Sequence, residues 1–513
     1  MARYALLSVS DKSHLAPFAA RLAEQGFTLL STGGTAKVLR EAGLSVTDVS
    51  AHTGHPEIMN GRVKTLHPRV HGGILADRRV HADEAAEHDI PMIDVVVVNL
   101  YPFEQVTQRE VDRSTAVETI DIGGPTMVRA AAKNHAHVTV VVDPADYDEV
   151  AEAPAAGGSV PLRRRLARKA FRHTARYDAV IADWLARADD DTGFPVETGV
   201  GLRKVQDCRY GENPHQAAAF YADGQVSGRS LARAVQKQGK ELSFNNIADL
   251  DGALRAVFDL DAPAAVVVKH MNPCGLATAE QLPDAFRQAL AGDPVSAFGG
   301  ILAFNRPVDG ATVKAVRMSR TFFEVLAAPG FTDEALEKLA PREKLRVLEL
   351  PADWAAGRPP GRDARRVQGG WLLQDWDLGA EVSWTVASQR APTPAEERSL
   401  RFAWTACRHV KSNGIVLARA TDDGAALNGV GAGQMSRVDS VRLAVSKATE
   451  PTAGCALASD AFFPFADGVK VALEAGVTAF VQPGGSIRDD EVLAAIDAAG
   501  ATMVFTGVRH FRH

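Results

Sequence analysis

The first 150 residues alternate two apolar patterns. Short β-branched runs, such as "IDVVVVNLYPF" and "HVTVVVDP", predict strands that are buried on both faces. Between such runs, stretches such as "LAPFAARLAEQG" and "TAKVLREAG" place their apolar residues at helical spacing. Strands and helices that alternate in this way predict an α/β domain with a mostly parallel sheet.

A long helical segment and a polar break separate this domain from the rest of the chain. Leu162–Ala188 carries the longest helical pattern, and "DDDTGFPVETGVG" after it has the composition of a linker. We therefore predict two domains, 1–198 and 199–513. In the second, the Pro/Gly/Arg-rich "PADWAAGRPPGRDARR" and a faint likeness between "VKHMNPCGLA" and "VKSNGIVLA" suggest two duplicated subdomains, approximately 199–360 and 361–513.

Composition narrows the class of protein. The chain has 513 residues, of which 46% are hydrophobic, and a formal net charge of -6. This mild acidity argues against a general nucleic-acid binder. An apolar run long enough to cross a bilayer is missing, and the opening "MARYALLSVSDK" lacks the order of a secretory signal. The four cysteines are widely spaced, which favours free thiols in a reducing compartment. We therefore expect a cytoplasmic protein, and from its charge and hydropathy we expect no nucleic-acid or membrane partner.

Two short motifs in the first domain could bind an anion. In "SVSDK" and "STGGT", a strand passes through small residues into a helix, whose first backbone N–H groups are free. The hydroxyls of Ser10, Ser31 and Thr35 and the charge of Lys12 would complete a cradle. A capped turn is the alternative for each motif alone. Two such motifs in one domain favour a phosphate site.

Four more polar residues of this domain stand in or near turns after strands. They are Lys64 in "GRVKTLHPRVHGG", Tyr101 in "NLYPF", Asp121 in "IDIGGPT" and Lys133 in "AAAKNH". Ligands of open α/β sheets collect outside the carboxyl ends of the strands. The four side chains could therefore converge on one ligand, although each alone is more often structural.

A Lys-His pair ends a buried strand in the second domain. The run "APAAVVV" leads into Lys269 and His270, and we expect a Pro-Cys-Gly turn after them. A zinc deaminase would carry H-x-E followed by P-C-x-x-C. Both the glutamate and the second cysteine are missing here, so we expect no zinc site. One interpretation is then that His270 is a general base and Lys269 a cation beside it. The alternative is that His270 is a core residue with its hydrogen bonds made inside the protein, and that the charged end of Lys269 reaches solvent.

These motifs together resemble the AICAR transformylase/IMP cyclohydrolase family of purine biosynthesis. The resemblance runs in order from near residue 4 to the C-terminus. It is carried by "SVSDK", "STGGTAK", "GRVKTLHP", "NLYPF", "IDIGGPT", "AAAKNH", "RYGENPHQ", "KHMNPCG", "SAFGG", "GAGQMSR" and "SDAFFPF". It implies an α/β fold with an N-terminal methylglyoxal-synthase-like domain and two C-terminal cytidine-deaminase-like subdomains that lack the catalytic metal.

The resemblance implies two reactions. The C-terminal region would transfer a formyl group from 10-formyltetrahydrofolate, the co-substrate, to AICAR, which gives FAICAR. His270 would be the base or proton shuttle, Lys269 and Asn413 would stabilise the formyl oxygen, and Asp467 would contact the folate. The expected nucleotide-binding residues are Arg209, Tyr210, Asn246, Gly299, Glu324, Arg437, Phe462 and Arg509.

The N-terminal domain would close FAICAR to IMP with loss of water. By resemblance Lys64, Tyr101, Asp121 and Lys133 would move the protons. The expected substrate-binding residues are Ser10, Lys12, Ser31, Gly33, Gly34, Thr35, Arg62, Thr65, Asn99 and Gly123.

The resemblance also implies a homodimer and allows a structural monovalent cation.

Three rival interpretations would explain parts of the same sequence pattern. The chain could be a nucleotide-binding regulator that has lost an activity, a zinc deaminase, or a methylglyoxal-synthase-like lyase. The intact Lys269-His270 pair argues against the first, and the incomplete zinc motif argues against the second.

Overall fold

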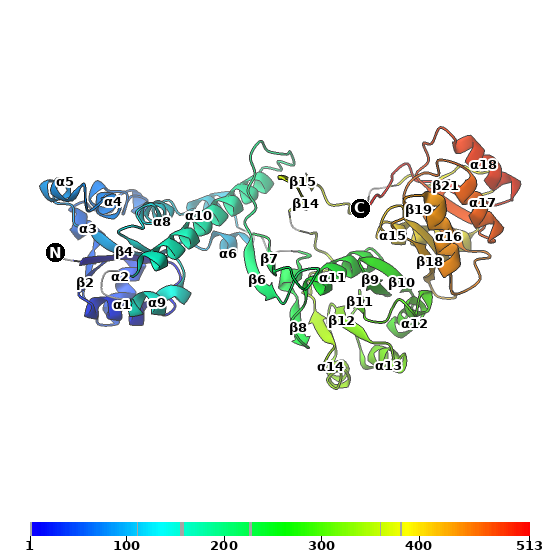
Figure 1. The fold of residues 1–513 in the computed structure, drawn as a ribbon, viewed down its shortest axis with the longest axis horizontal. Helices are drawn as coiled ribbons and strands as arrows, with labels where there is room; N and C mark the ends of the chain where they lie inside the picture. Colours follow the sequence, from blue (N-terminus) through cyan, green and yellow to red (C-terminus); the bar gives the residue numbers. More distant parts are fainter. Residues whose placement is uncertain (1–2, 110, 154–157, 225–227, 360, 380–381) are drawn as a thin grey trace. The chain divides into compact units, whose positions relative to one another are not determined.

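The computed structural model describes residues 3–513 except 110, 154–157, 225–227, 360 and 380–381 (Figure 1). The chain forms two compact units. The first ends at Arg203, apart from a short return at Asp223 and Gly224, and the second holds the rest to His513.

The first unit is built on a five-stranded, fully parallel sheet in the order β3-β2-β1-β4-β5. Its strands are β1 (Arg3–Val9), β2 (Phe27–Ser31), β3 (Val46–Asp48), β4 (Ile93–Asn99) and β5 (Thr139–Val141). The predicted β-branched runs lie in β4 and β5, where Val95–Val98 are almost fully buried. The expected parallel α/β sheet is therefore confirmed.

Helices cover both faces of this sheet (Figure 1). One face carries α1 (Leu15–Glu24), α2 (Gly33–Glu41) and α9 (Tyr147–Glu152); the other carries α4 (Pro68–Leu75), α8 (Gly123–Lys133) and α10 (Val160–Ala188). The shorter helices are α3 (Val49–Thr53), α5 (Ala82–Glu87), α6 (Phe103–Thr107) and α7 (Arg113–Glu118). The long helix predicted at Leu162–Ala188 is α10, which starts two residues earlier because the Ser159 hydroxyl accepts the Leu162 N–H.

The strand order of the first unit reverses between β1 and β4. The chain winds outward from β1 to β2 and β3 on one side, and from β4 to β5 on the other. Loops that leave two such strands diverge, which opens a crevice at their carboxyl ends. Ser10 follows β1 and Asn99 ends β4, so both predicted residues stand at this crevice.

The second unit contains one mixed sheet of twelve strands, in the order β16-β21-β20-β19-β17-β18-β10-β9-β11-β12-β13-β8. Its first part uses β8 (Val235–Gln238), β9 (Ala264–Lys269), β10 (Asn272–Thr278), β11 (Gly300–Phe304), β12 (Phe323–Ala328) and β13 (Arg346–Glu349). Its second part uses β16 (Thr385–Val386), β17 (Ile415–Ala420), β18 (Ala425–Gly431), β19 (Ala456–Ser459), β20 (Ala479–Gln482) and β21 (Thr502–Phe505). Two small hairpins pair β6 (Arg203–Cys208) with β7 (Ala218–Ala222) and β14 (Asp363–Val367) with β15 (Gly370–Gln374).

The two halves of this sheet repeat one strand order. The order β10-β9-β11-β12-β13 matches β18-β17-β19-β20-β21, and the halves join where Ala277 of β10 pairs with Ala426 of β18. This repeat agrees with the duplication expected from the sequence. The two sequence segments that resemble each other do not occupy equivalent positions in this repeat, however. "VKHMNPCGLA" covers the end of β9 and most of β10, whereas "VKSNGIVLA" leads into β17.

Helices cover both faces of the large sheet as well. On one face, α11 (Phe244–Val257) and α15 (Pro394–Cys407) share a single apolar core with strands from both halves. On the other face, α12 (Leu282–Gly292), α13 (Gly310–Met318) and α14 (Asp333–Leu339) cover the first half, and α16 (Arg437–Lys447), α17 (Asp467–Glu474) and α18 (Asp489–Ala498) the second.

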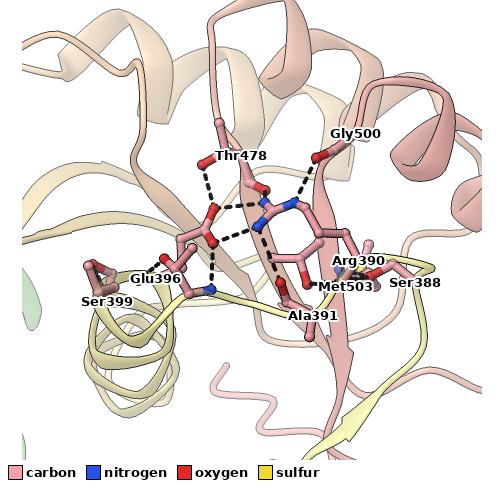
Figure 2. A network of polar contacts seen from close by, with 11 residues as sticks. Ser388, Arg390, Ala391, Glu396, Ser399, Thr478, Gly500 and Met503 are labelled. Atoms are coloured by element: carbon pink, nitrogen blue, oxygen red, sulfur yellow. Dashed lines mark hydrogen bonds and ion pairs between the residues drawn. The ribbon is translucent and has the colours of Figure 1, made fainter.

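A polar network fixes the start of α15 against the strands of the second half (Figure 2). Arg390 donates two hydrogen bonds of 2.8 Å to the Glu396 carboxylate and a third, of 2.7 Å, to the Gly500 carbonyl. The hydrogen bonds from Arg390 lower the pKa of Glu396 to about 2. Because Thr478 also donates to Glu396, the helix start is tied to the segment that leads into β20.

Two candidate active sites

In the first unit, the side chain of Asn99 joins the two strands that border the crevice. Its Oδ1 accepts the backbone N–H groups of Ser10, at 2.6 Å, and Asp11, at 2.8 Å. Its Nδ2 donates to the Asp11 carbonyl at 3.0 Å. Asn99 therefore fixes the loop after β1, a role that is additional to the predicted substrate contact.

Two lysines lie over the first turn of α2. A Cβ atom built on Gly33 would stand 3.7 Å from Lys64 Nζ, and one on Gly34 would stand 3.9 Å from Lys12 Cε. The free N–H groups of a helix start attract anions, and two ammonium groups strengthen that attraction. Lys64 also forms an ion pair with Glu57 at 3.1 Å. This geometry supports the predicted anion cradle.

The hydroxyls of Ser31 and Thr35 have other partners. Ser31 is fully buried and donates to the Leu7 carbonyl at 2.7 Å. Thr35 Oγ1 lies 3.1 Å from both the N–H and the carbonyl of Val9. These hydroxyls hold β1 against β2 and α2, and their contact with an anion stays a prediction.

Asp121 stands at the start of α8, where its carboxylate accepts the Gly124 N–H at 2.8 Å. Burial raises the pKa of Asp121, and backbone hydrogen bonds from Gly124 and Tyr101 oppose the shift. Thr65 reaches the same place, because a Cβ on Gly123 would stand 2.8 Å from its Oγ1. Three predicted residues, Thr65, Asp121 and Gly123, thus gather at one helix start.

Three other predicted residues of the first unit lie differently. Lys133 ends α8, which at 1.5 Å per residue places it about 15 Å along the helix from Gly123. Arg62 pairs with Glu118. The side chain of Tyr101 is 59% exposed. The structure therefore does not bring Lys133 against Asp121, and its proton-transfer role stays a prediction.

In the second unit, most candidate residues border one end of the large sheet. β9 ends where β11 and β12 begin, since Val268 pairs with Ile301 and Gly300 pairs with Phe323. β17 begins where β18 and β19 end. β10 starts beside the end of β18 because these strands are antiparallel. The residues that border this end are Lys269, His270, Gly299, Glu324, Asn413, Arg437 and Phe462.

Lys269 occupies the last position of β9. Its Nζ donates to the Phe298 carbonyl at 2.9 Å, and a Cβ on Gly299 would stand 3.1 Å from the same nitrogen. An ammonium carries three donors, so two remain for a ligand.

His270 and Met271 form the two-residue turn between β9 and β10, with φ angles of 51° and 62°. Two central residues at positive φ are typical of a type I′ hairpin turn, in which glycine and asparagine are preferred. Each residue held in such a conformation costs about 1–3 kcal/mol. Asp249 of α11 stabilises the turn by accepting the Met271 N–H at 2.7 Å. Burial raises the pKa of this carboxyl.

The predicted Pro-Cys-Gly turn is wrong. Pro273 and Cys274 lie inside β10, where an irregularity in the pairing with β9 accommodates them. The Cys274 thiol points to the Val267 carbonyl at 3.4 Å, and burial raises its pKa to about 12. Among the residues described, no three His, Cys, Asp or Glu side chains gather to hold a metal ion.

Asn413 is fixed by a buried charge pair. Its Oδ1 accepts from Arg437 at 2.8 Å, and its Nδ2 donates to the Gln434 carbonyl at 2.8 Å. Arg437 also donates to Ser459 and pairs with Asp460, whose side chain is fully buried. The guanidinium predicted to hold the nucleotide is thus engaged within the protein, where it orients Asn413.

The remaining predicted residues fall into two groups. Asn246 completes a capping box with Ser243 at the start of α11, and Glu324 pairs with Arg346 at 2.6 Å, so both have structural partners. The others have exposed side chains or stand in turns: Arg209, Tyr210, Phe462, Asp467 and Arg509. Asp467 accepts the N–H of Gly468 at the start of α17.

Sequence reasoning missed three residues that hold the second site. They are Asp249, Asn272 and Asp460. Only Asp460 carried a signal, as an acidic residue next to the apolar run of "SDAFFPF".

Comparisons with known proteins identify the family of this chain. The sequence model of the AICARFT/IMPCHase bienzyme family matches residues 131–447, and that of the MGS-like domain matches residues 14–126. The chain is 52% identical over 532 residues to the bifunctional purine biosynthesis protein PurH of Magnetococcus marinus, with 99% of each chain covered. It is 53% identical over 519 residues to PurH of Myxococcus xanthus, with 99% of this chain and 100% of the relative covered.

A solved structure, the crystal structure of ForH, is 39% identical and covers 36% of this chain and 98% of its own. Its TM-score of 0.33 is too low to bear on the fold. The family match spans more than half of the sequence, and the relatives match nearly all of it. The chain therefore belongs to the AICARFT/IMPCHase bienzyme family.

Proposed function

We infer that this protein is a bifunctional enzyme of purine biosynthesis, which formylates AICAR and then closes FAICAR to IMP. The observation that carries this function is the presence of two chemically different sites in separate units of a chain that belongs to the bienzyme family. One site combines an anion cradle with a buried carboxyl group, and the other combines a lysine, a histidine and an oriented amide.

Formyl transfer is proposed for the second unit. The 5-amino nitrogen of AICAR attacks the formyl carbon, and the carbonyl oxygen gains negative charge in the tetrahedral intermediate. His270 takes the proton from the attacking nitrogen, and Lys269 donates to the oxygen through a free N–H. The intermediate collapses as the C–N bond to the folate breaks and the folate nitrogen receives a proton.

Asn413 requires a rearrangement to assist this step. Both protons of its amide are engaged, one with the Gln434 carbonyl at 2.8 Å and one with the Met435 carbonyl at 3.2 Å. We propose that the longer bond opens when the formyl oxygen arrives. The Arg437 contact to Oδ1 keeps the amide in its orientation during this exchange.

Ring closure is proposed for the first unit. The carboxamide nitrogen of FAICAR attacks the formyl carbon of the same molecule, and water leaves. Because both groups belong to one substrate, holding them in contact supplies much of the acceleration. A carboxyl group with a raised pKa, such as Asp121, is better suited to proton transfer than an exposed carboxyl group, and Lys64 stands beside the proposed phosphate cradle.

Several finer assignments are proposals as well. We propose that Asp467 contacts the folate, that Arg209, Tyr210, Phe462 and Arg509 hold the nucleotide, and that the chain forms a homodimer. The predicted domain ends at 198 and 199, the structural cation, and the cytoplasmic location also stay predictions. None of the helices in the described part of the chain is both long and apolar enough to span a membrane.

The test is incubation of the purified protein with AICAR and 10-formyltetrahydrofolate. We expect IMP to form, with FAICAR as the intermediate. Formation of neither product would contradict the proposed function.

A further inference from the structure

The side chain of Asn272 bridges two loops that carry candidate catalytic residues. Its Nδ2 donates to the His270 carbonyl at 3.0 Å. Its Oδ1 accepts the N–H of Lys411 at 3.0 Å, across 139 residues of sequence. Lys411 lies two positions before Asn413, so one amide touches the backbone on both sides of the site.

The first of these loops has a conformation that needs such support. The His270–Met271 turn keeps two residues other than glycine at positive φ. Uncommon backbone conformations persist only where the surroundings enforce them, and they cluster at functional sites. Asp249 holds the turn through the Met271 N–H, and Asn272 holds it through the His270 carbonyl. The second loop is tied to the first by the Lys411 N–H.

An amide is the side chain that this bridge requires. It supplies a donor and an acceptor at once, whereas a carboxylate supplies acceptors only and a methyl group supplies neither. An Asn272→Asp variant would keep the bond to the Lys411 N–H and lose the bond to the His270 carbonyl. An Asn272→Ala variant would lose both.

We propose that Asn272 is a positioning residue for formyl transfer, which sets the imidazole of His270 relative to the amide of Asn413. This inference rests on the proposed function of the second unit. The residue acts through the backbone and not on the substrate. Its loss should therefore lower the rate of the chemical step more than it weakens substrate binding.

The test compares Asn272→Ala with Asn428→Ala. Asn428 is a matched control, because it is a buried amide of the same unit that also bridges backbone groups, the N–H and carbonyl of Glu450. We expect Asn272→Ala to lower kcat for formyl transfer by about 100-fold with the KM for AICAR changed less than about threefold, as for a misplaced catalytic group. Asn428→Ala should keep kcat. Both variants should convert supplied FAICAR to IMP at the wild-type rate.

A double-mutant cycle separates positioning from a general loss of structure. If Asn272 acts by setting His270 relative to Asn413, adding Asn272→Ala to an Asn413→Ala variant should lower kcat little further. The losses of kcat from the two substitutions are then not additive. Additive losses, or an Asn272→Ala variant with wild-type kcat, would overturn the proposal. If Asn272→Ala fails to fold, the isosteric Asn272→Asp variant should show the same loss of kcat, and a wild-type kcat there would overturn it. Failure of the wild-type protein itself to form FAICAR would instead refute the proposed function.

Discussion

Lys269 and Gly299 approach each other so closely that a single methyl group on Gly299 would stand 3.1 Å from Lys269 Nζ. Gly299 has a φ of 71°, and its N–H donates to the Phe322 carbonyl at 2.7 Å, so its backbone position is fixed. The ammonium of Lys269 can therefore lie at the end of the sheet because Gly299 has no side chain there. Glycine is required here for both its conformation and its size.

A Gly299→Ala substitution should displace the ammonium and lower formyl transfer by about 100-fold, because a misplaced catalytic group costs that much. Gly454→Ala is the matched control: its φ is 75°, but a Cβ there would meet no atom within 4 Å. Both variants should lose about 1 kcal/mol of unfolding free energy from the strained alanine. Steady-state kinetics and thermal unfolding measure the two effects. Equal activity of the two variants would contradict the account of Lys269.

Arg437 offers a test of orientation against substrate binding. Arg437→Lys keeps the charge but cannot contact Asp460 and Asn413 at once. We expect kcat for formyl transfer to fall while the KM for AICAR changes little. Arg437→Ala should cost about 3–5 kcal/mol of stability, since it leaves a buried carboxylate unpaired.

The control for this experiment is Arg442→Lys in the same helix, whose exposed pair with Asp439 should contribute little. If Arg437→Lys raised the KM for AICAR and left kcat unchanged, the guanidinium would instead bind the nucleotide, as the family resemblance implies.

The difference at Arg437 illustrates what the sequence could predict. β-branched runs predicted β4 and β9, and helical spacing predicted α10, because these elements depend on local pattern and burial. An arginine in a polar segment is equally suited to a phosphate and to a buried carboxylate. Its partner Asp460 is 23 residues away, and only tertiary structure shows that this carboxylate is fully buried.

The turn at His270 was misplaced for a related reason. Proline and glycine favour turns, which directed the expectation to Pro273-Cys274-Gly275. The observed turn begins three residues earlier, at His270, where Asp249 and Asn272 stabilise a backbone conformation that local preference disfavours. The hydroxyls of Ser31 and Thr35 suited an anion site by type, and only the structure shows that they also contact Leu7 and Val9 of β1.

Asp121 should give ring closure a distinctive pH dependence. Burial raises its pKa above the ordinary value of 3.8. If its ionised form accepts the proton, the rate falls as pH drops through this raised pKa, at a higher pH than for an exposed carboxyl group. Asp121→Asn should lower ring closure on supplied FAICAR by about 10²–10⁴-fold and leave formyl transfer unchanged. This role would be contradicted if Asp121→Asn closed the ring at the wild-type rate and its rate still fell at low pH as in the wild type.

Metal removal should leave both reactions intact. A cysteine binds zinc as its thiolate, and burial raises the pKa of Cys274 to about 12, which disfavours that form. We expect dialysis against a chelator to leave formyl transfer unchanged and the purified protein to hold less than one zinc ion per chain. A stoichiometric metal whose removal abolishes transfer would contradict the expectation and revive the deaminase interpretation.

The most direct test of two separate sites is a pair of complementary variants, assayed with AICAR and 10-formyltetrahydrofolate and then with supplied FAICAR. Lys64→Ala should accumulate FAICAR without IMP. Lys269→Ala should form no FAICAR from AICAR but should convert supplied FAICAR to IMP. Loss of both activities in either variant, in a protein that remains folded, would contradict the assignment of one reaction to each unit.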